Sequence, residues 1–421
     1  MWSLDSNSGN ARRTPLSDMS VPCDVSVVAK PHGPNVKSPQ IIADPAALSE
    51  LAARLASHTR IAVDTEAASF HRYVDRVYLV QVGNDSEIAL VDPLAFDDLQ
   101  PIGALLADAK VEVVFHDADY DLRILNRDYG FIARNIFDTR IAAQLAGEES
   151  VGLGALLDKY FQVAVNKKFQ RADWSQRPLP REMIAYAADD TRYLLPLRDQ
   201  LSDRLRAMNR LEWAEEEFAL LENRRWTQPV DEEHAFLRIK GAKALPRRSL
   251  AVLRELHAWR ERTASSLDKA PFRILGNAAL LSLSRAAPKN LDRLSSTPGI
   301  PTSAVRRYGA ELLEAVTKGL AIPGKDLPRT RRTARPETDH AYDQSLERLK
   351  TLRNSRAKEI NMEPGLLCPN GTLQAVARAA PEAVGELESI TEMRRWQRSV
   401  LGVSAILEAA SDAKQRKRPH G

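Results

Sequence analysis

The sequence predicts a mixed α/β domain followed by two all-α domains, and three observations lead to this prediction. Apolar residues first gather in three short segments, 61–64, 77–82 and 87–91, with the length and composition of β-strands. Strand and helix patterns then alternate. After Pro180 the apolar residues recur almost entirely at helical spacing, and part of this half repeats itself at an offset of 93 residues.

The front half is expected to form one sheet covered by helices. Asp44 and Pro45 are an N-cap and first-turn pair for a helix that runs to about Ser57. The three strand segments form a meander, and three further elements follow it: a helix at 96–107, a strand at 111–115 and a helix from about Tyr120. A meander followed by alternating strands and helices indicates a mixed sheet.

Two segments of the helical half are copies of one unit. Shifting the chain by 93 residues without gaps places like residues on like over about forty positions. The matches include Leu256 with Leu349, Arg260 with Arg353, Asn277 with Asn370, and the tetrapeptide 285–288 with 378–381. One shared tetrapeptide could arise by chance in an Ala- and Arg-rich chain, but the whole register indicates a duplicated helical unit.

Composition restricts the class of protein. Hydrophobic residues make up 43% of the 421 residues, and no apolar run approaches the roughly 18–20 residues that cross a bilayer. The N-terminal segment 1–16 lacks the apolar core of a secretory signal. Cys23 and Cys368 fall in different predicted domains, so we expect neither a disulfide nor a thiolate metal site. A cytoplasmic location is therefore expected.

Charge is distributed unevenly along the chain. Residues 1–200 hold 21 basic and 28 acidic side chains, a net charge of −7, whereas the remainder holds 39 and 28, a net charge of +11. This asymmetry favours a rear half that binds a polyanion and a front half that holds cations. Solvated, Arg-rich helices would give the same numbers, so charge alone leaves both interpretations open.

Four acidic residues stand out by their positions. Asp64 and Glu66 close the first strand of the predicted meander and, being two residues apart, point the same way. Asp121 opens a helix after a strand, and Asp190 lies in an apolar helix one turn after Tyr186. Each alone has an ordinary explanation as a cap or a solvated turn. Together they form a set of oxygen ligands for hard cations such as Mg²⁺, without which they would repel one another.

These residues lie in segments that resemble a known group of nucleases, the DEDD exonucleases. Three motifs occur in order, at 61–66 (Ile-Ala-Val-Asp-Thr-Glu), at His116 followed by Asp121-Leu122, and at 186–190 (Tyr-Ala-Ala-Asp-Asp). The segment 171–179 resembles the ribonuclease D family itself, and the two repeats resemble HRDC domains, which are small helical nucleic-acid-binding modules. Three motifs in order, with this additional segment, are a specific signal.

The resemblance implies a ribonuclease H-like mixed α/β fold with the carboxylates at one edge of the sheet. It implies that two divalent ions, Mg²⁺ or Mn²⁺, are bound by four residues, Asp64, Glu66, Asp121 and Asp190. Tyr186 would orient the attacking water, and a tyrosine four residues before Asp190, with Ala185 in the place of a histidine, is similar to the tyrosine (DEDDy) type. The implied activity is that of a monomeric 3′→5′ exoribonuclease that releases 5′-nucleoside monophosphates from structured RNA with a short 3′ tail, such as tRNA precursors.

The aspartates of the second and third motifs require a choice. Asp117 and Asp119 lie beside Asp121, but Asp121 precedes a leucine and has the family spacing from the histidine. Asp189 lies beside Asp190, and the step of four residues from the tyrosine favours Asp190.

Three further residues are weaker candidates. Asp138 is expected either to support the site or to cap the helix that follows it. His116 is expected to be a packed or supporting group instead of a ligand. Lys168 either holds a substrate phosphate or lies in a solvated loop.

Two other functions remain open from the sequence. A DNA exonuclease of the same superfamily would share the motifs, and the sequence does not locate a contact to the 2′-hydroxyl that would decide the sugar. A non-catalytic RNA-binding protein on the same scaffold would normally have lost a ligand, and here all are present.

The chain is expected to divide into seven parts. These are a disordered tail (1–37), a DEDDy 3′–5′ exonuclease domain (38–212), a helical connector (213–243), a first HRDC-like domain (244–322), a linker (323–338), a second HRDC-like domain (339–411) and a basic tail (412–421).

Overall fold

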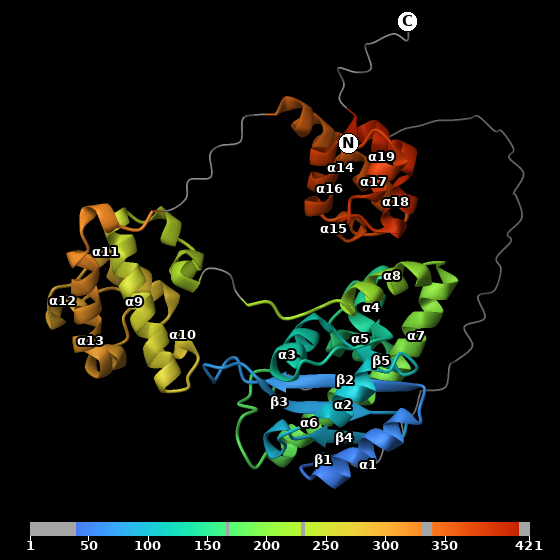
Figure 1. The fold of residues 1–421 in the computed structure, drawn as a ribbon, viewed down its shortest axis with the longest axis horizontal. Helices are drawn as coiled ribbons and strands as arrows, with labels where there is room; N and C mark the ends of the chain where they lie inside the picture. Colours follow the sequence, from blue (N-terminus) through green and yellow to red (C-terminus); the bar gives the residue numbers. More distant parts are fainter. Residues whose placement is uncertain (1–38, 166–167, 229–231, 330–338, 412–421) are drawn as a thin grey trace, which may run out of the picture. The chain divides into compact units, whose positions relative to one another are not determined.

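The computed structural model describes residues 39–165, 168–228, 232–329 and 339–411 (Figure 1). The predicted tails and most of the predicted linker lie outside these residues. None of the helices in the described ranges combines the length and the apolar character that crossing a bilayer requires.

The front half contains one six-stranded mixed sheet. Its strands are β1 (Gln40–Ile42), β2 (Arg60–Ala67), β3 (Val77–Gly83), β4 (Ile88–Val91), β5 (Glu112–Phe115) and β6 (Ile136–Asp138). They lie in the order β1-β4-β3-β2-β5-β6. β2, β3 and β4 pair antiparallel, and the other three pairs are parallel. The predicted mixed sheet and its central meander are therefore confirmed.

Helices cover both faces of this sheet (Figure 1). They are α1 (Pro45–Ala56), η1 (Pro93–Ala95), α2 (Gln100–Ala107), α3 (Asp119–Tyr129), α4 (Thr139–Leu145), α5 (Leu153–Phe161), α6 (Arg181–Arg192), α7 (Leu194–Ala207) and α8 (Leu211–Leu221). On one face Ile61 and Val63 pack with α1, α2 and α3. On the other face Ala62 packs with α4, α5 and α7, while α6 packs against β3 and β4. Successive side chains of β2 thus enter different cores.

The strand that carries two of the predicted carboxylates is longer than expected. β2 continues through Asp64 and Glu66 to Ala67, so these residues lie inside the strand instead of closing it. They pair with β3 up to a bulge between Glu66 and Ala67. β2 is a central strand of the sheet, and both carboxylates lie in its C-terminal half, beyond the residues that pair with β5. Because acidic residues are uncommon in strands, the strand predicted from the sequence ended too early.

Other differences from the sequence prediction concern short elements and helix ends. β1 and β6 have three residues each, which is too short to show a period of two. The helix predicted to start near 96 begins at Gln100, and the helical stretch from 180 to 223 is three helices, α6 to α8. The first helix is confirmed with its predicted cap, since Asp44 accepts a hydrogen bond from the Ala46 N–H at 2.9 Å.

Every secondary-structure element in the described residues of the rear half is a helix, and the duplicated unit is confirmed. The connector holds η2 (Glu232–Arg238) and η3 (Ala242–Ala244). The first unit has α9 (Arg247–Ser266), α10 (Pro271–Ile274), α11 (Asn277–Ala286), α12 (Leu291–Ser295) and α13 (Thr302–Ala321), and η4 (Gly324–Asp326) follows. The second has α14 (His340–Glu359), α15 (Pro364–Leu367), α16 (Asn370–Ala379), α17 (Val384–Glu388), α18 (Arg395–Leu401) and α19 (Val403–Ala410). The first four helices of each unit have 20, 4, 10 and 5 residues.

One buried contact explains a matched pair of the repeat. Arg260 Nη1 donates a hydrogen bond to Asn277 Oδ1 at 2.7 Å, and Arg353 Nη1 donates to Asn370 Oδ1 at 2.8 Å in the second unit. Both arginines are buried. Each guanidinium therefore joins the long first helix of its unit to the first residue of the third helix. This contact needs an arginine and an asparagine at the same separation in both units, so the repeat keeps both residues.

Candidate active site

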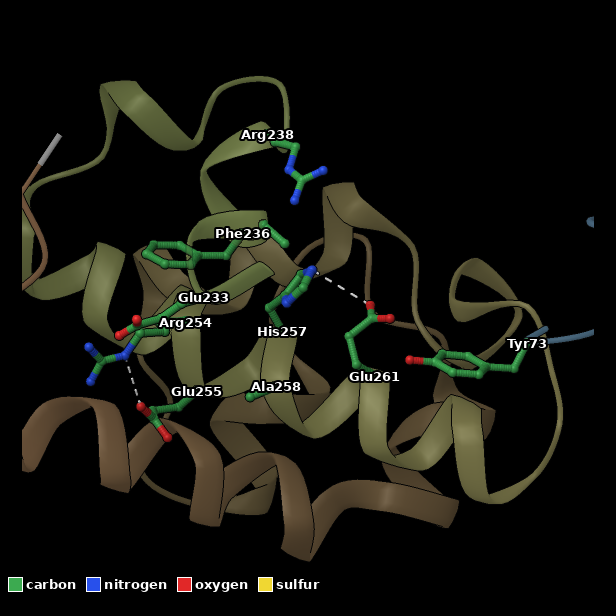
Figure 2. Close-up of a pocket in the computed structure, with 10 residues that line it drawn as sticks. Tyr73, Glu233, Phe236, Arg238, Arg254, Glu255, His257, Ala258 and Glu261 are labelled. Atoms are coloured by element: carbon green, nitrogen blue, oxygen red, sulfur yellow. Dashed lines mark hydrogen bonds and ion pairs between the residues drawn. The ribbon is translucent and has the colours of Figure 1, made fainter. Parts of the chain in front are cut away.

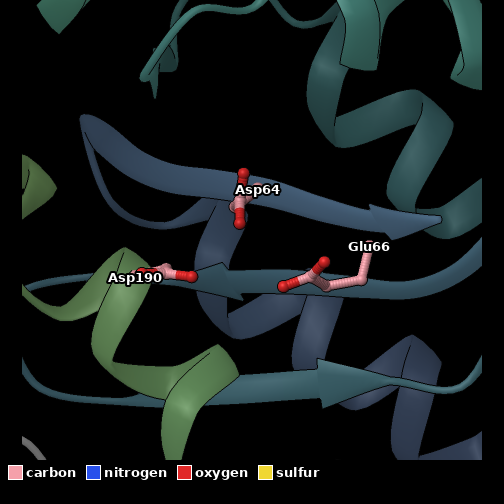
Figure 3. Close-up of side chains that lie close together, drawn as sticks. All are labelled: Asp64, Glu66 and Asp190. Atoms are coloured by element: carbon pink, nitrogen blue, oxygen red, sulfur yellow. The ribbon is translucent and has the colours of Figure 1, made fainter. Parts of the chain in front are cut away.

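Asp64 and Glu66 lie on the same face of β2, because side chains two residues apart in a strand point the same way. Asp190 of α6 joins them on this face. One carboxylate oxygen from each of the three lies within 4.8 Å of the others, and Figure 3 shows the three groups converging from β2 and α6. The structure therefore brings together three of the four predicted ligands in one group.

Asp121 approaches the same part of β2 from the layer of α1 to α3. It is buried in the first turn of α3 and accepts a hydrogen bond from the Thr65 hydroxyl. Thr65 stands between Asp64 and Glu66 in β2, so this bond holds Asp121 next to them. Asp121 is not among the three carboxylates that lie within 4.8 Å of one another, but its negative charge raises the pKa of both Asp64 and Glu66.

Tyr186 stands beside Asp190 because the two are four residues apart on α6. It donates a hydrogen bond to the Asp190 carboxylate. The rings of Phe169 and Trp174 pack against the tyrosine ring, with centroids at 5.9 and 6.1 Å, and Trp174 is buried. Burial and the nearby negative charge of Asp190 raise the pKa of the Tyr186 hydroxyl, so it remains a neutral hydrogen-bond donor at neutral pH.

Burial is the largest cause of the raised pKa values of the four carboxyl groups, and for Asp64 and Glu66 repulsion by the neighbouring carboxylates is the next largest. The pKa of Asp64 is raised by burial and then by the charges of Asp121 and Asp190, and that of Glu66 by burial and then by Asp64. Burial raises the pKa of Asp121 and of Asp190 from 3.8 to about 7 each. No described lysine or arginine is among the main causes of these four shifts. Within the described residues, the four carboxyl groups therefore form an acidic group without a basic partner.

This donor set fits a hard divalent cation. Carboxylate oxygens are the ligands that Mg²⁺ and Mn²⁺ prefer, and the group of three offers oxygens close enough to share an ion. A cation would also cancel the repulsion that raises the carboxyl pKa values. The geometry and the charge thus point to the same kind of occupant.

The raised pKa of Asp190 predicts a pH-dependent stability for the metal-free protein. The folded state holds this proton up to about pH 7, whereas the unfolded chain releases it near 3.8, so its contribution to stability is present below pH 4 and is lost as pH rises through 7. In EDTA we expect Asp190→Asn to melt like the wild type only near pH 4 and below, and the difference should grow as the pH rises towards 7. Near pH 8 its free energy of unfolding should be higher than that of the wild type by roughly 1–4 kcal/mol.

Thermal denaturation of both proteins at several pH values measures this difference. Adding Mg²⁺ at pH 8 should stabilise the wild type and leave the variant nearly unchanged, because the cation needs the carboxylate. A stability difference that shrinks as pH rises would contradict the prediction.

Asp138, a weaker candidate, caps the helix that follows it, which is one of the two roles predicted for it. Its carboxylate caps α4 by accepting hydrogen bonds from the N–H groups of Arg140 and Ile141 at 2.8 and 3.0 Å. It also accepts from Ala118 N at 2.8 Å and from Asp117 N at 3.3 Å. Asp117 has a φ of 67°, so Asp138 holds the left-handed turn that starts α3 and thereby positions Asp121.

The aspartates that flank the predicted ligands have other partners. Asp117 pairs with Arg140 at 2.9 Å and Asp119 with Arg224 at 3.0 Å. Asp189 is exposed and pairs with Arg192 at 3.1 Å. The exposed Lys168 lies with its Nζ 5.1 Å from the centroid of the Phe169 ring, which in turn contacts Tyr186. This places the lysine one aromatic ring away from the site.

A cavity of about 350 Å³ opens onto the carboxylates. Asp64, His116, Tyr186 and Asp190 line this cavity. The beginning of α5, from Gly152 to Ala155, lines it too, although the sequence did not indicate these residues as part of the site. The α5 residues carry no local pattern that could have identified them, because they join the site through contacts distant in sequence.

A larger cavity, of about 900 Å³, lies elsewhere, along η2 and α9 (Figure 2). Its acids are interspersed with basic groups instead of being clustered. Glu255 pairs with Arg254 at 3.2 Å and Glu261 with His257 at 3.6 Å. The smaller cavity, which is lined by Asp64 and Asp190 of the acidic group, is therefore the candidate active site.

Comparison with known proteins gives the class of the molecule. Residues 39–206 match the family model for a 3′–5′ exonuclease, and 249–316 and 343–409 each match the HRDC domain. The fold and the acidic site thus define a divalent-metal-dependent 3′–5′ exonuclease with two HRDC domains.

Relatives identify the family. The chain is 32% identical over 372 residues to ribonuclease D of Granulibacter bethesdensis, covering 88% of this chain and 92% of the relative. It is 28% identical over 368 residues to ribonuclease D of Desulfotalea psychrophila, covering 87% and 97%. The crystal structure of Escherichia coli RNase D, an exoribonuclease involved in structured RNA processing, matches with a TM-score of 0.65 at 26% identity, over 91% of this chain and 100% of that one. The chain belongs to the ribonuclease D family and is a 3′–5′ exoribonuclease.

Proposed function

We propose that Asp64, Glu66, Asp121 and Asp190 together hold two divalent ions, Mg²⁺ or Mn²⁺, at which the 3′-terminal phosphodiester of RNA is hydrolysed. The observation that carries the proposal is the group of three carboxylates within 4.8 Å of one another, of which Asp64 and Asp190 line a cavity together with Tyr186. Asp121 completes the set through its hydrogen bond to Thr65, which holds it beside β2. Bound divalent ions neutralise charge on the phosphate and make the attacking water more acidic.

The side chains of the site have separate roles in this proposal. Tyr186 is a neutral donor held by two aromatic rings and by its bond to Asp190, so it can orient a water molecule towards the phosphorus. The water oxygen bonds to phosphorus, the bond from phosphorus to the 3′ oxygen of the preceding nucleotide breaks, and that oxygen takes up a proton. The products are a 5′-nucleoside monophosphate and an RNA shorter by one nucleotide.

The proposed substrate is structured RNA with a short single-stranded 3′ tail, such as a tRNA precursor. The E. coli relative is an exoribonuclease involved in structured RNA processing. The rear half of the present chain, which contains both HRDC domains, has a net charge of +11, which suits binding to a phosphate backbone without sequence preference. We further propose that the protein acts as a monomer in the cytoplasm, where such precursors are processed.

A 5′-labelled RNA hairpin with a short 3′ overhang tests the proposed function. With Mg²⁺ or Mn²⁺ we expect a ladder that shortens from the 3′ end, with nucleoside 5′-monophosphates as the released product and no ladder in EDTA. A hairpin of DNA with the same sequence should be trimmed more slowly. Faster trimming of DNA would favour a deoxyribonuclease, and stoichiometric binding without cleavage under either metal would favour an RNA-binding protein.

A further inference from the structure

His116 has a defined arrangement of its ring protons. Its Nδ1 lies 2.9 Å from the Thr139 hydroxyl, and the same hydroxyl donates to the Phe115 carbonyl at 3.0 Å. A threonine hydroxyl has one proton, and a carbonyl oxygen can only accept. The hydroxyl therefore gives its proton to Phe115 and accepts one from His116, so the ring proton lies on Nδ1.

The opposite nitrogen of this ring is consequently a hydrogen-bond acceptor. Burial and the nearby charge of Arg140 lower the pKa of His116 to about 4, so the ring is neutral at physiological pH and Nε2 keeps a free lone pair. Among the described residues, none donates a hydrogen bond to Nε2. His116 lines the same cavity as Asp64, Tyr186 and Asp190. The cavity is thus lined by a histidine whose acceptor nitrogen has no donor among the described residues.

The position of His116 restricts what that partner can be. The carboxylates of the cavity are where the terminal phosphate would be cleaved, and the ribose is the part of the terminal nucleotide directly attached to that phosphate. A ribose hydroxyl is a hydrogen-bond donor, as a neutral imidazole nitrogen requires. The 3′-hydroxyl is common to RNA and DNA, whereas the 2′-hydroxyl is the group by which a protein distinguishes them.

We propose that His116 Nε2 accepts a hydrogen bond from the 2′-hydroxyl of the 3′-terminal ribose, which makes His116 a specificity-determining residue. This inference rests on the proposed function, because it assumes that the terminal nucleotide occupies the 350 Å³ cavity. Thr139 acts through His116 as a positioning residue, since its hydroxyl keeps the proton on Nδ1 and leaves Nε2 as the acceptor.

RNA oligonucleotides that differ only in the last sugar test this proposal. The removal of the terminal nucleotide is followed for ends that carry ribose, 2′-deoxyribose, 2′-fluororibose or 3′-deoxyribose. For the wild type we expect kcat/KM to be about 3- to 10-fold lower on the 2′-deoxy and 2′-fluoro ends than on the ribose end, as loss of one neutral hydrogen bond implies. In His116→Ala the ribose end should lose this advantage, and all 2′ variants should react at rates within about twofold of one another.

Two further variants separate the contact from general damage. His58 lies on the surface at the end of α1, where it contacts the Arg54 carbonyl, and His58→Ala should keep the wild-type preference for ribose. Thr139→Val removes the hydroxyl that orients the ring and should reduce the preference without removing the histidine. The ratio between sugars is informative even if either site variant lowers the overall rate.

The outcomes distinguish this inference from the proposed function. If the wild type trims no RNA, the proposed function fails. If it trims RNA but His116→Ala keeps the full preference for a terminal ribose, the 2′-hydroxyl contact is refuted and the proposed function stands. If His116→Ala instead removes any rate difference that the wild type shows between ribose and 3′-deoxyribose ends, His116 contacts the 3′-hydroxyl and the proposal is also overturned.

Discussion

Asp190→Asn is expected to lower kcat/KM for RNA trimming by on the order of a thousandfold or more. The substitution keeps the shape of the side chain but removes one of the three carboxylates that lie within 4.8 Å of one another. A neutral amide oxygen is a poor substitute where the protein must balance two divalent charges. Rates on the 5′-labelled hairpin in Mg²⁺ measure the loss, and RNA binding in EDTA should be retained because the basic rear half is unchanged.

Asp189→Asn is the matched control for this experiment. Asp189 precedes Asp190 on the same turn of α6, but it is exposed and pairs with Arg192. The same chemical change at this position should leave the trimming rate within about twofold of the wild type, since exposed ion pairs contribute little. Equal losses in both variants would show that the damage comes from α6 itself and not from a lost metal ligand.

Tyr186→Phe is expected to lower kcat by about a hundredfold or more while KM changes little. The ring would remain packed between Phe169 and Trp174, so the fold should be unaffected. The hydroxyl that donates to Asp190 and orients the water would be lost. Since this group acts on the attacking water and not on the bound RNA, the loss should appear in kcat. Single-turnover rates at saturating enzyme measure the chemical step.

Tyr193→Phe provides the comparison for the tyrosine variant. Tyr193 directly follows α6 and contacts the Phe161 ring, with centroids 5.6 Å apart. Removing its hydroxyl should change neither kcat nor KM by more than about twofold. A Tyr186→Phe enzyme with an unchanged kcat would remove the tyrosine from the mechanism and leave water orientation to other groups.

Local patterns in the sequence were sufficient for the parts of this protein that depend on neighbouring residues. The meander, the alternation of strands and helices and the capped first helix follow from spacing and capping chemistry. The duplicated helical unit could be found because register over a fixed offset survives in sequence, down to the Arg260 and Arg353 pair. The motif residues were candidates for the same reason, since each motif lies within one short segment.

The tertiary structure decided everything that depends on segments distant in sequence. It made β2 a central strand that continues through both carboxylates, and it placed Asp190 against them from α6, more than a hundred residues away. It paired Thr65 with Asp121, and it set the ring proton of His116 through Thr139, 23 residues further along the chain. Hydrogen-bond partners, burial and the resulting pKa values depend on the spatial neighbours of a group. The sequence alone therefore determined the fold class and the candidate residues, while packing decided their geometry and protonation.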